Sequence, residues 1–347
     1  MRFHKAAPVV GLALALALTA CGGSGSGSAS AGSSGGSTPV KFVLNYTPGP
    51  QHEEFVVAKE SGYYSKAGLD VTMTPPAATT DPVKLVASGQ ADIGIAYAGD
   101  VISAAAQGVP VESVATIHRH NALGLLSKPG SGITTPKSLE GKRVGLTPIP
   151  ANRALFDEFL RVNHVDASKV EIVPVNFNGP QLVAAGNIDA ADAVSFYELG
   201  IYKQLTQQEP EFVKFTDFGV PDGYYFTLIT SQRFAAKNPD VVKKFVAATL
   251  EAEKWTLENP DQANDILIKK VPDVGLEFAR TSRGYIKDLV VDDASQKNGL
   301  GWSDKSVWAR QAKFFKDTGQ IDKSVDVGTL FTNDFLPGKP VTVNLPS

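Results

Sequence analysis

The sequence predicts an α/β fold in which two similar lobes, each a doubly wound sheet, enclose a central cleft. The first observation is a repeat, because segment 85–92 returns as segment 182–189 with five identities among eight positions. Each copy ends an apolar helix at a glycine that can adopt the left-handed conformation, and then continues through an acidic turn residue into a strand. The second observation is that strand-like and helix-like segments alternate from residue 40 to residue 230. The order helix, glycine, turn, strand also arises by coincidence in other α/β proteins.

The first lobe is predicted to begin with the order strand, helix, strand. Thr47–Pro50 turns the chain into a helix that has Glu53 and Glu54 near its start and ends at Gly62. Asp81 and Pro82 have the order of an N-cap and a first-turn proline, so the helix of the first repeat begins there. The other predicted ranges are a strand at 40–45, a turn at 63–68, a strand at 69–73 and a strand at 92–97.

The second lobe repeats this scheme. An amphipathic helix is predicted at 151–163, because its large apolar residues share one face. The other predicted elements are strands at 142–146, 171–175 and 190–194, and the helix of the second repeat at 180–185. The alternation predicts parallel sheets, and Asp92 and Asp189 are explained as turn residues that the repeat requires.

After a strand at 226–230 the pattern changes to helices. Asn238–Pro239 and Asn259–Pro260 each combine a capping residue with a helix-starting proline, and Ser303 is predicted to cap a third helix that ends at Gly319. We expect this helical part to complete the first lobe, so that the chain crosses between the lobes twice. The predicted lobes comprise residues 40–127 with 231–347, and residues 128–230.

The N-terminus has the build of a secretory signal peptide, predicted as residues 1–20. Arg2 and Lys5 precede an uncharged run that is too short to span a bilayer. The run ends directly before Cys21 and resembles a bacterial lipobox, which implies that Cys21 carries lipid. Residues 21–39 are then a Gly/Ser tether that holds the body at the extracytoplasmic face of the cell membrane. The alternative is an ordinary signal peptide with an incidental cysteine.

Charge and cysteine content exclude several classes of protein. Removal of residues 1–20 leaves 31 basic and 36 acidic residues, a net charge of −5, so nucleic acid is not an expected partner. A single cysteine allows neither an internal disulfide nor a zinc site built on thiolates, and only His118 and His120 lie close in sequence. We expect neither a cofactor nor a bound metal.

Candidate ligand-binding residues follow the predicted strands, since ligands gather at the carboxyl ends of strands in open α/β sheets. Tyr46 and Tyr97 are positioned to stack on a flat ring, and Glu198 to accept a hydrogen bond from an amine. Backbone N–H groups and Asn152 at a helix start are positioned to bind an oxygen or a small anion. The full candidate set is Tyr46, His52, Tyr97, His118, Thr147, Asn152, Tyr197, Glu198 and Tyr224. The alternatives are core packing for the aromatic residues, a solvated helix position for Glu198 and a capping role for His52.

Several segments resemble one family over nearly all of residues 40–337. Val43–Pro48, His52, Gly62–Tyr64 and Ala67–Val71 look like the opening of substrate-binding proteins that serve ABC importers of thiamine pyrimidine precursors. The similarity continues through Gly141–Gly145, the second repeat and Phe331–Leu336. The fungal pyrimidine synthases of thiamine biosynthesis share this opening. The resemblance implies a type II periplasmic-binding-protein fold that closes like a hinge on a small ligand.

The resemblance also implies roles for individual residues. Tyr46 stands where the pyrimidine receptors usually have tryptophan, His52 matches a histidine of theirs, and Glu198 lies close to their glutamate of the second lobe. Gly49 and Glu54 depart from the pattern, as does Tyr46, so receptors for sulfonate or taurine, nitrate or riboflavin remain alternatives. We expect a monomeric lipoprotein that delivers a thiamine-precursor-like aminopyrimidine to an ABC permease with its ATPase.

An enzyme resembling the fungal synthases is the rival class. Those enzymes hold pyridoxal phosphate on a lysine and consume a nearby histidine, and the matching positions here are Ala96 and Asp100. A Schiff base requires an amine at the first position, so the sequence predicts a receptor and no enzyme. A surface adhesin is a third class, which would not require polar and aromatic groups at the strand ends.

Overall fold

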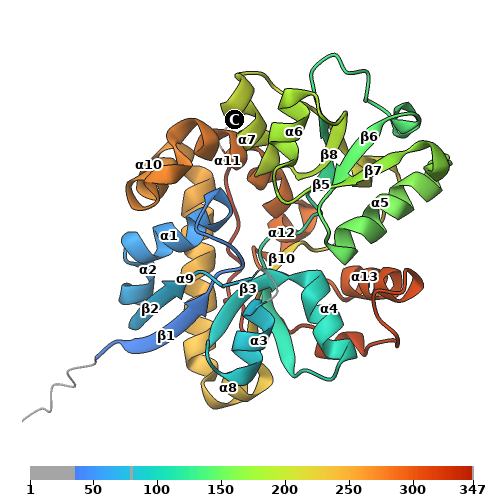
Figure 1. The fold of residues 1–347 in the computed structure, drawn as a ribbon. Helices are drawn as coiled ribbons and strands as arrows, with labels where there is room; N and C mark the ends of the chain where they lie inside the picture. Colours follow the sequence, from blue (N-terminus) through green and yellow to red (C-terminus); the bar gives the residue numbers. More distant parts are fainter. Residues whose placement is uncertain (1–35, 79–80, 346–347) are drawn as a thin grey trace, which may run out of the picture. The chain divides into compact units, whose positions relative to one another are not determined.

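The computed structural model describes residues 36–78 and 81–345, and these residues form two five-stranded sheets flanked by helices (Figure 1). The predicted signal peptide, Cys21 and most of the predicted tether lie outside the described residues. Strand β1 begins at Thr38, so the predicted tether does not extend to residue 39. Within the described ranges, no helix combines the length and the apolar character that crossing a membrane requires.

The first sheet has the strand order β2-β1-β3-β10-β4. Strand β1 pairs in parallel with β2 and β3, whereas β10 runs antiparallel to both β3 and β4. Its strands are β1 (Thr38–Val43), β2 (Leu69–Thr74), β3 (Ile93–Tyr97), β4 (Val111–Thr116) and β10 (Phe226–Ser231).

The second sheet has the same plan, in the order β7-β6-β8-β5-β9. Strand β6 pairs in parallel with β7 and β8, and β5 runs antiparallel to β8 and β9. Its strands are β5 (Leu123–Ser127), β6 (Arg143–Leu146), β7 (Glu171–Pro174), β8 (Ala190–Val194) and β9 (Glu211–Lys214). The prediction of wholly parallel sheets is therefore wrong for one strand of each sheet, β10 and β5. Each of these strands enters its sheet from the other lobe, at the edge where the parallel strands end. It is therefore antiparallel to its neighbours.

The chain passes between the two sheets twice, as the sequence predicts. Strand β4 of the first sheet is followed by β5 of the second, and β9 of the second by β10 of the first. Strand pairing moves both lobe boundaries by one strand. Residues 123–127, which form β5, fell within the predicted first lobe, and residues 226–230 of β10 fell within the predicted second lobe. From here on, each lobe is named by its sheet. The sequence missed this exchange because short apolar strands carry no signal of which sheet they join.

The eight-residue repeat has the same structure in both lobes. Gly89 and Gly186 both adopt the left-handed conformation, with φ of 79° and 78°. Asp92 then accepts a hydrogen bond from the N–H of Lys41 at 2.8 Å, and Asp189 accepts one from the N–H of Arg143 at 2.8 Å. Each aspartate thereby joins the turn of its repeat to the neighbouring parallel strand, β1 or β6, which explains why the repeat needs an acid there.

Helices α1, α2 and α9 lie beside β1 and β2 in Figure 1. They span α1 (Glu53–Glu60), preceded by the short η1 (Pro50–His52), α2 (Tyr63–Lys66) and α9 (Pro239–Glu258). The turn predicted at 63–68 is wrong, since α2 occupies most of it. Tyr64 is buried, and its ring stacks on Phe245 of α9 at 4.9 Å, so a tertiary contact favours the helical turn.

The remaining helices of the first lobe include several that the sequence analysis did not identify. They are α3 (Asp81–Ser88), α4 (Ala98–Ala106), α8 (Gln232–Lys237), α10 (Pro260–Lys270), α11 (Leu276–Val290), α12 (Asp293–Asn298) and α13 (Lys305–Asp317). Ser303 does not cap α13, because Asp304 occupies the N-cap position. The Ser303 hydroxyl instead lies 2.6 Å from that of Thr116 at the end of β4. The second lobe contains α5 (Pro150–Val162), α6 (Gly179–Ala185) and α7 (Glu198–Thr206).

A cluster of charged side chains is buried between α1, α9 and α11. Arg283 Nε lies 3.3 Å from Glu53 Oε2, and its Nη2 lies 3.8 Å from Glu253 Oε1. The three side chains are at most 5% exposed. Burial raises the pKa of Glu53 to about 7 and holds the pKa values of Glu54 and Glu253 above their ordinary range, against the opposing charge of Arg283. One arginine therefore faces three carboxyl groups. Because their pKa values are raised, not all three are ionised at neutral pH.

Candidate ligand-binding cavity

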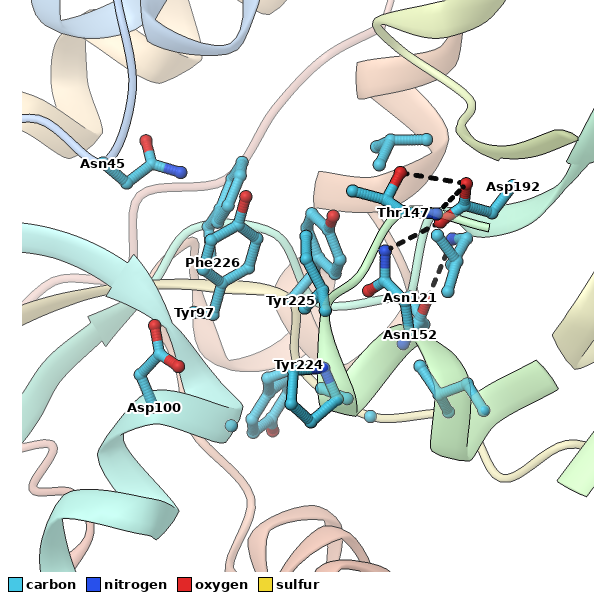
Figure 2. Close-up of a pocket in the computed structure, with 18 of the residues that line it drawn as sticks. Asn45, Tyr97, Asp100, Asn121, Thr147, Asn152, Asp192, Tyr224, Tyr225 and Phe226 are labelled. Atoms are coloured by element: carbon cyan, nitrogen blue, oxygen red, sulfur yellow. Dashed lines mark hydrogen bonds between the residues drawn. The ribbon is translucent and has the colours of Figure 1, made fainter. Parts of the chain in front are cut away.

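A cavity of about 550 Å³ lies between the two sheets, where the parallel strands end. Tyr46 follows β1, Tyr97 ends β3, Thr147 follows β6 and Glu198 follows β8, and all four line the cavity. In Figure 2, Asn45, Tyr97 and Asp100 face Thr147, Asn152 and Asp192 across it, with Tyr225 between them. The carboxyl ends of the parallel strands therefore form the cavity, as expected for open α/β sheets.

Seven of the nine candidate residues line the cavity. They are Tyr46, Tyr97, Thr147, Asn152, Tyr197, Glu198 and Tyr224. Six of them follow the ends of predicted strands, whereas Tyr224 lies on the second crossover, before β10. Whether they contact a ligand stays a prediction.

His52 and His118 are the two candidates that the structure places outside the cavity lining. Both rings are fully buried, and burial lowers the pKa of each to about 3, so both are neutral. His52 Nε2 lies 2.7 Å from Asn45 Oδ1. A neutral ring with its proton on Nε2 donates this hydrogen bond and orients the Asn45 side chain, which also interacts with Tyr97. His52 is thus a positioning residue for Asn45, and His118 packs against Phe196 and Phe226.

Thr147 and Asn152 line the cavity, but their donor groups are directed at Asp192. The carboxylate of Asp192 accepts from the Thr147 N–H at 2.9 Å, the Thr147 hydroxyl at 3.0 Å and the Asn152 NH₂ at 3.1 Å (Figure 2). Burial raises the pKa of Asp192, while these three bonds oppose the shift. Asn152, the side chain of the expected anion site at the start of α5, is therefore bound to a carboxylate of the protein, which would repel a second anion.

Two groups of aromatic side chains form the apolar part of the wall. Tyr46 of the first lobe contacts Tyr197 of the second edge-on, with ring centres 5.9 Å apart, and lies 6.4 Å from Phe177. Tyr97 packs against Tyr225 at 5.3 Å and Phe226 at 5.0 Å, both on the second crossover segment or the strand it enters. Tyr46 and Tyr97, which were expected to stack on a ligand ring, are therefore each packed against further aromatic side chains.

Tyr224 contributes little polar chemistry to the cavity. Its hydroxyl accepts from the N–H of Asp304 at 2.7 Å, and its ring packs against Trp308 with centres 5.6 Å apart. The Arg119 guanidinium lies over the same ring, 5.5 Å from its centre. Burial raises the pKa of Tyr224 to about 12. Tyr224 thus fixes the crossover segment against the start of α13.

Glu198 begins α7 and has one oxygen engaged. Its Oε2 accepts from the N–H of Val194 at 2.7 Å, which closes the turn between β8 and α7. Burial raises the pKa of Glu198 to about 7. The partly exposed side chain lines the cavity, and among the described residues no hydrogen bond to its second oxygen, Oε1, is found.

All ionisable acid–base side chains of the cavity wall, apart from the tyrosines, are carboxyl groups among the residues that the structure describes. Four carboxyl groups line the cavity, from Asp100, Asp192, Glu198 and Asp222, and no arginine, lysine or histidine does. Asp222 is satisfied by the N–H groups of Asn121 and Gly223, both at 2.9 Å, and by His120 at 2.6 Å. Within residues 36–78 and 81–345, no three histidine, cysteine, aspartate or glutamate side chains are arranged so that they could hold a metal ion.

Several wall residues were missed by the sequence analysis. They include Asn45, Gln51, Asp100, Asn121, Asp192, Asp222, Tyr225 and Phe226. Asn45 and Asp100 lie within three residues of a predicted strand end. Counting every polar residue within three positions of these strand ends as a candidate would have included them. The crossover residues follow no predicted strand and carried no such signal.

The comparisons with known proteins agree with this architecture. Residues 49–263 match the family described as NMT1/THI5 like. The chain is 27% identical to a formylaminopyrimidine-binding protein of Halalkalibacterium halodurans over 78% of this chain and 82% of that protein. It is 26% identical to the riboflavin-binding protein RibY of Chloroflexus aurantiacus over 86% of each chain.

An enzyme is also among the relatives. A 4-amino-5-hydroxymethyl-2-methylpyrimidine phosphate synthase of Legionella pneumophila is 24% identical over 87% of this chain and 93% of that protein. The fold matches the periplasmic aliphatic sulphonate binding protein SsuA of Escherichia coli with a TM-score of 0.66 and 17% identity, over 86% of this chain and 99% of that one. The two-sheet α/β architecture is thus the periplasmic-binding-protein fold, and the chain belongs to the NMT1/THI5-like family.

Proposed function

We propose that this protein is an extracytoplasmic solute-binding lipoprotein that captures an amino-bearing heterocycle, in the first place an aminopyrimidine, and delivers it to an ABC importer. One observation carries the proposal: the cavity wall combines aromatic rings with carboxyl groups and has no basic side chain within the described residues. Rings of the wall bind a flat ligand, and carboxylates accept hydrogen bonds from its amino groups.

The same wall argues against anionic ligands. A sulfonate or nitrate would enter a cavity with four carboxyl groups and no countercharge among the lining residues, and desolvating an unpaired anion is costly. The side-chain amide of Asn152 at the start of α5 offers no substitute, because it already donates to Asp192, as do the N–H and hydroxyl groups of Thr147 just before the helix. Receptors for taurine, other sulfonates or nitrate are therefore disfavoured, although they share the fold.

Riboflavin is the second candidate ligand. A cavity of about 550 Å³ lies within the range of drug-sized ligands, so it has room for a ring system larger than one pyrimidine. Neutral amide side chains of Gln107, Gln311 and Gln320 line it near α4 and α13, where they suit hydroxyl groups. The relative named RibY binds riboflavin, and this supports the same alternative here.

A receptor fits the cavity better than a synthase does. Ala96 and Asp100 stand where the family resemblance implies the lysine and the histidine of the fungal enzymes, and no lysine lines the cavity within the described residues. A covalent imine with pyridoxal phosphate needs that amine. We therefore assign capture and release of the ligand, without chemical conversion.

The membrane attachment is a separate part of the proposal. The lipobox-like segment before Cys21 predicts a diacylglyceryl group on the cysteine sulfur after cleavage. Mass spectrometry of the protein extracted from membranes should find Cys21 as the modified N-terminus. A mature chain that begins elsewhere, with no lipid mass, would contradict the anchor and leave the ligand proposal intact.

A thermal-shift screen tests the ligand class. The chain from Gly22 onward contains all described residues, and it is tested with aminopyrimidines, thiamine, riboflavin, taurine and nitrate. A ligand at 100 times its dissociation constant should stabilise the protein by about 2.7 kcal/mol. We expect such stabilisation from an amino-bearing heterocycle and none from taurine or nitrate. If no heterocycle shifts the melting temperature, the ligand proposal fails.

A further inference from the structure

Asp100 is a charged side chain of the cavity wall to which no role has yet been assigned. It lies in the first turn of α4, directly after β3, and it is the only charged residue that the first lobe contributes to the wall within the described ranges. Its carboxyl group points toward Tyr97 in Figure 2. No hydrogen bond or ion pair of Asp100 is found among residues 36–78 and 81–345, whereas Asp192 and Asp222 each accept several.

The surroundings of Asp100 give its charge no partner from the protein. Helix α4 presents Asp100, Ser103 and Gln107 to the cavity at helical spacing, and the facing segment of α13 and the turn after it presents Gln311 and Gln320. These four lining side chains are neutral. Burial without compensation raises the pKa of Asp100 to about 6, so the group is mostly ionised at neutral pH and lacks a donor.

Glu198 is the corresponding group on the second lobe. The charges of Asp100 and Glu198 both act on Tyr97, because both contribute to the upward shift of its pKa. The two carboxyl groups also line the same cavity from different lobes, Asp100 in the first turn of α4 after β3 and Glu198 in the first turn of α7 after β8. A carboxylate that faces a cavity and accepts no hydrogen bond from the protein can accept one from a ligand without breaking a contact of the fold.

We infer that Asp100 is a ligand-binding residue that pairs with Glu198 across the cavity, so that the site selects a heterocycle with donor groups on two sides or with a positive charge. This inference rests on the proposed function and adds the second contact. A ligand held by one carboxylate from each lobe favours the closed arrangement of the two lobes, because only closure satisfies both groups.

The test uses Asp100→Asn and Asp100→Ala in the chain from Gly22 onward, with two probes that share an aminopyrimidine ring. 4-Amino-5-hydroxymethyl-2-methylpyrimidine is neutral, and thiamine carries a permanent positive charge. Asp240→Asn is the matched control, since Asp240 is an exposed aspartate in the first turn of α9 and lies outside the cavity lining. Dissociation constants are measured by calorimetry, and melting temperatures without ligand are recorded for each variant.

We expect both Asp100 variants to bind the better probe at least 10-fold more weakly, with the larger loss for thiamine, and to melt without ligand no lower than the parent protein. Asp240→Asn should bind like the parent. Unchanged affinity in both Asp100 variants would overturn the inference and leave the proposed function standing. A lower melting temperature in both variants with no ligand-specific loss would assign Asp100 to the fold and also overturn it. If the parent protein binds neither probe nor any other amino-bearing heterocycle, the proposed function fails and the inference with it.

Discussion

Glu198→Ala should weaken the binding of an aminopyrimidine by roughly 10- to 100-fold. A hydrogen bond that involves a charged group contributes about 1.5 to 3 kcal/mol, and this substitution removes the only carboxylate at the start of α7. Calorimetry at pH 8 is the appropriate measurement. Burial raises the pKa of Glu198 to about 7, so the group is largely ionised at that pH.

Glu171→Ala is the control for this experiment. Glu171 is an exposed glutamate at the start of β7 in the same lobe, and its oxygen lies 3.4 Å from Arg143 Nε on the surface. The control should bind like the parent protein. Equal affinities of Glu198→Ala and the parent would remove Glu198 from the binding site, even if its bond to Val194 still supports the turn.

Arg283→Ala should lower the free energy of unfolding by about 3 to 5 kcal/mol, the usual effect of removing one partner of a buried ion pair. Arg283 is the only basic group that faces Glu53 and Glu253, at 3.3 and 3.8 Å, within the described residues. Urea denaturation of the parent and the variant measures the difference.

Arg280→Ala is the matched control on the same helix. Arg280 Nη2 lies 3.3 Å from Asp261 Oδ1, but the two side chains are 53% and 79% exposed. Exposed pairs of this kind contribute about 0 to 1 kcal/mol, so the control should lose little stability. If both variants lost the same small amount, the buried cluster would not depend on its arginine.

The effect of Arg283→Ala should also grow with pH. The carboxyl groups of the cluster have folded pKa values above their unfolded value of about 4.3, so they stabilise the fold fully below that value and lose this contribution as pH rises through the folded values. His52 and His118, with pKa lowered to about 3, act in the opposite direction, but only below their unfolded value of about 6.5. Between pH 7 and pH 9 the carboxyl groups dominate, and stability should fall, more steeply without Arg283.

The repeat and the strand ends carried most of what could be predicted about the fold and the cavity. The left-handed conformation of Gly89 and Gly186 and the turn positions of Asp92 and Asp189 depend on local sequence, and the repeat predicted them. The hydrogen bonds that the two aspartates accept from Lys41 and Arg143, far away in the sequence, were not predicted. The reversed strands β5 and β10 depend on which sheet the chain enters, and no short-range pattern records that choice. The same limit hid Asp192, because its partners Thr147 and Asn152 are some 40 residues away.

Residue type alone was misleading at the two histidines. A histidine near a strand end suggests a ligand contact, but His52 and His118 are enclosed, and their neutral rings serve the packing and the orientation of Asn45. Asp100 was noted in the sequence only as the position of a missing histidine. Its place in the wall follows from the first turn of α4, a helix that the sequence analysis did not locate.

A comparison of heterocycles with sulfonate and nitrate ligands tests most directly whether this protein captures an amino-bearing heterocycle. The protein is titrated by calorimetry with 4-amino-5-hydroxymethyl-2-methylpyrimidine, thiamine and riboflavin, and in parallel with taurine and nitrate, all at one pH and salt concentration. The wall of rings and carboxyl groups predicts saturable binding of at least one neutral or cationic heterocycle. It predicts no heat of binding from nitrate or from taurine, whose sulfonate group would find no basic partner among the lining residues. Saturable binding of taurine or nitrate, with none of the heterocycles bound, would contradict it.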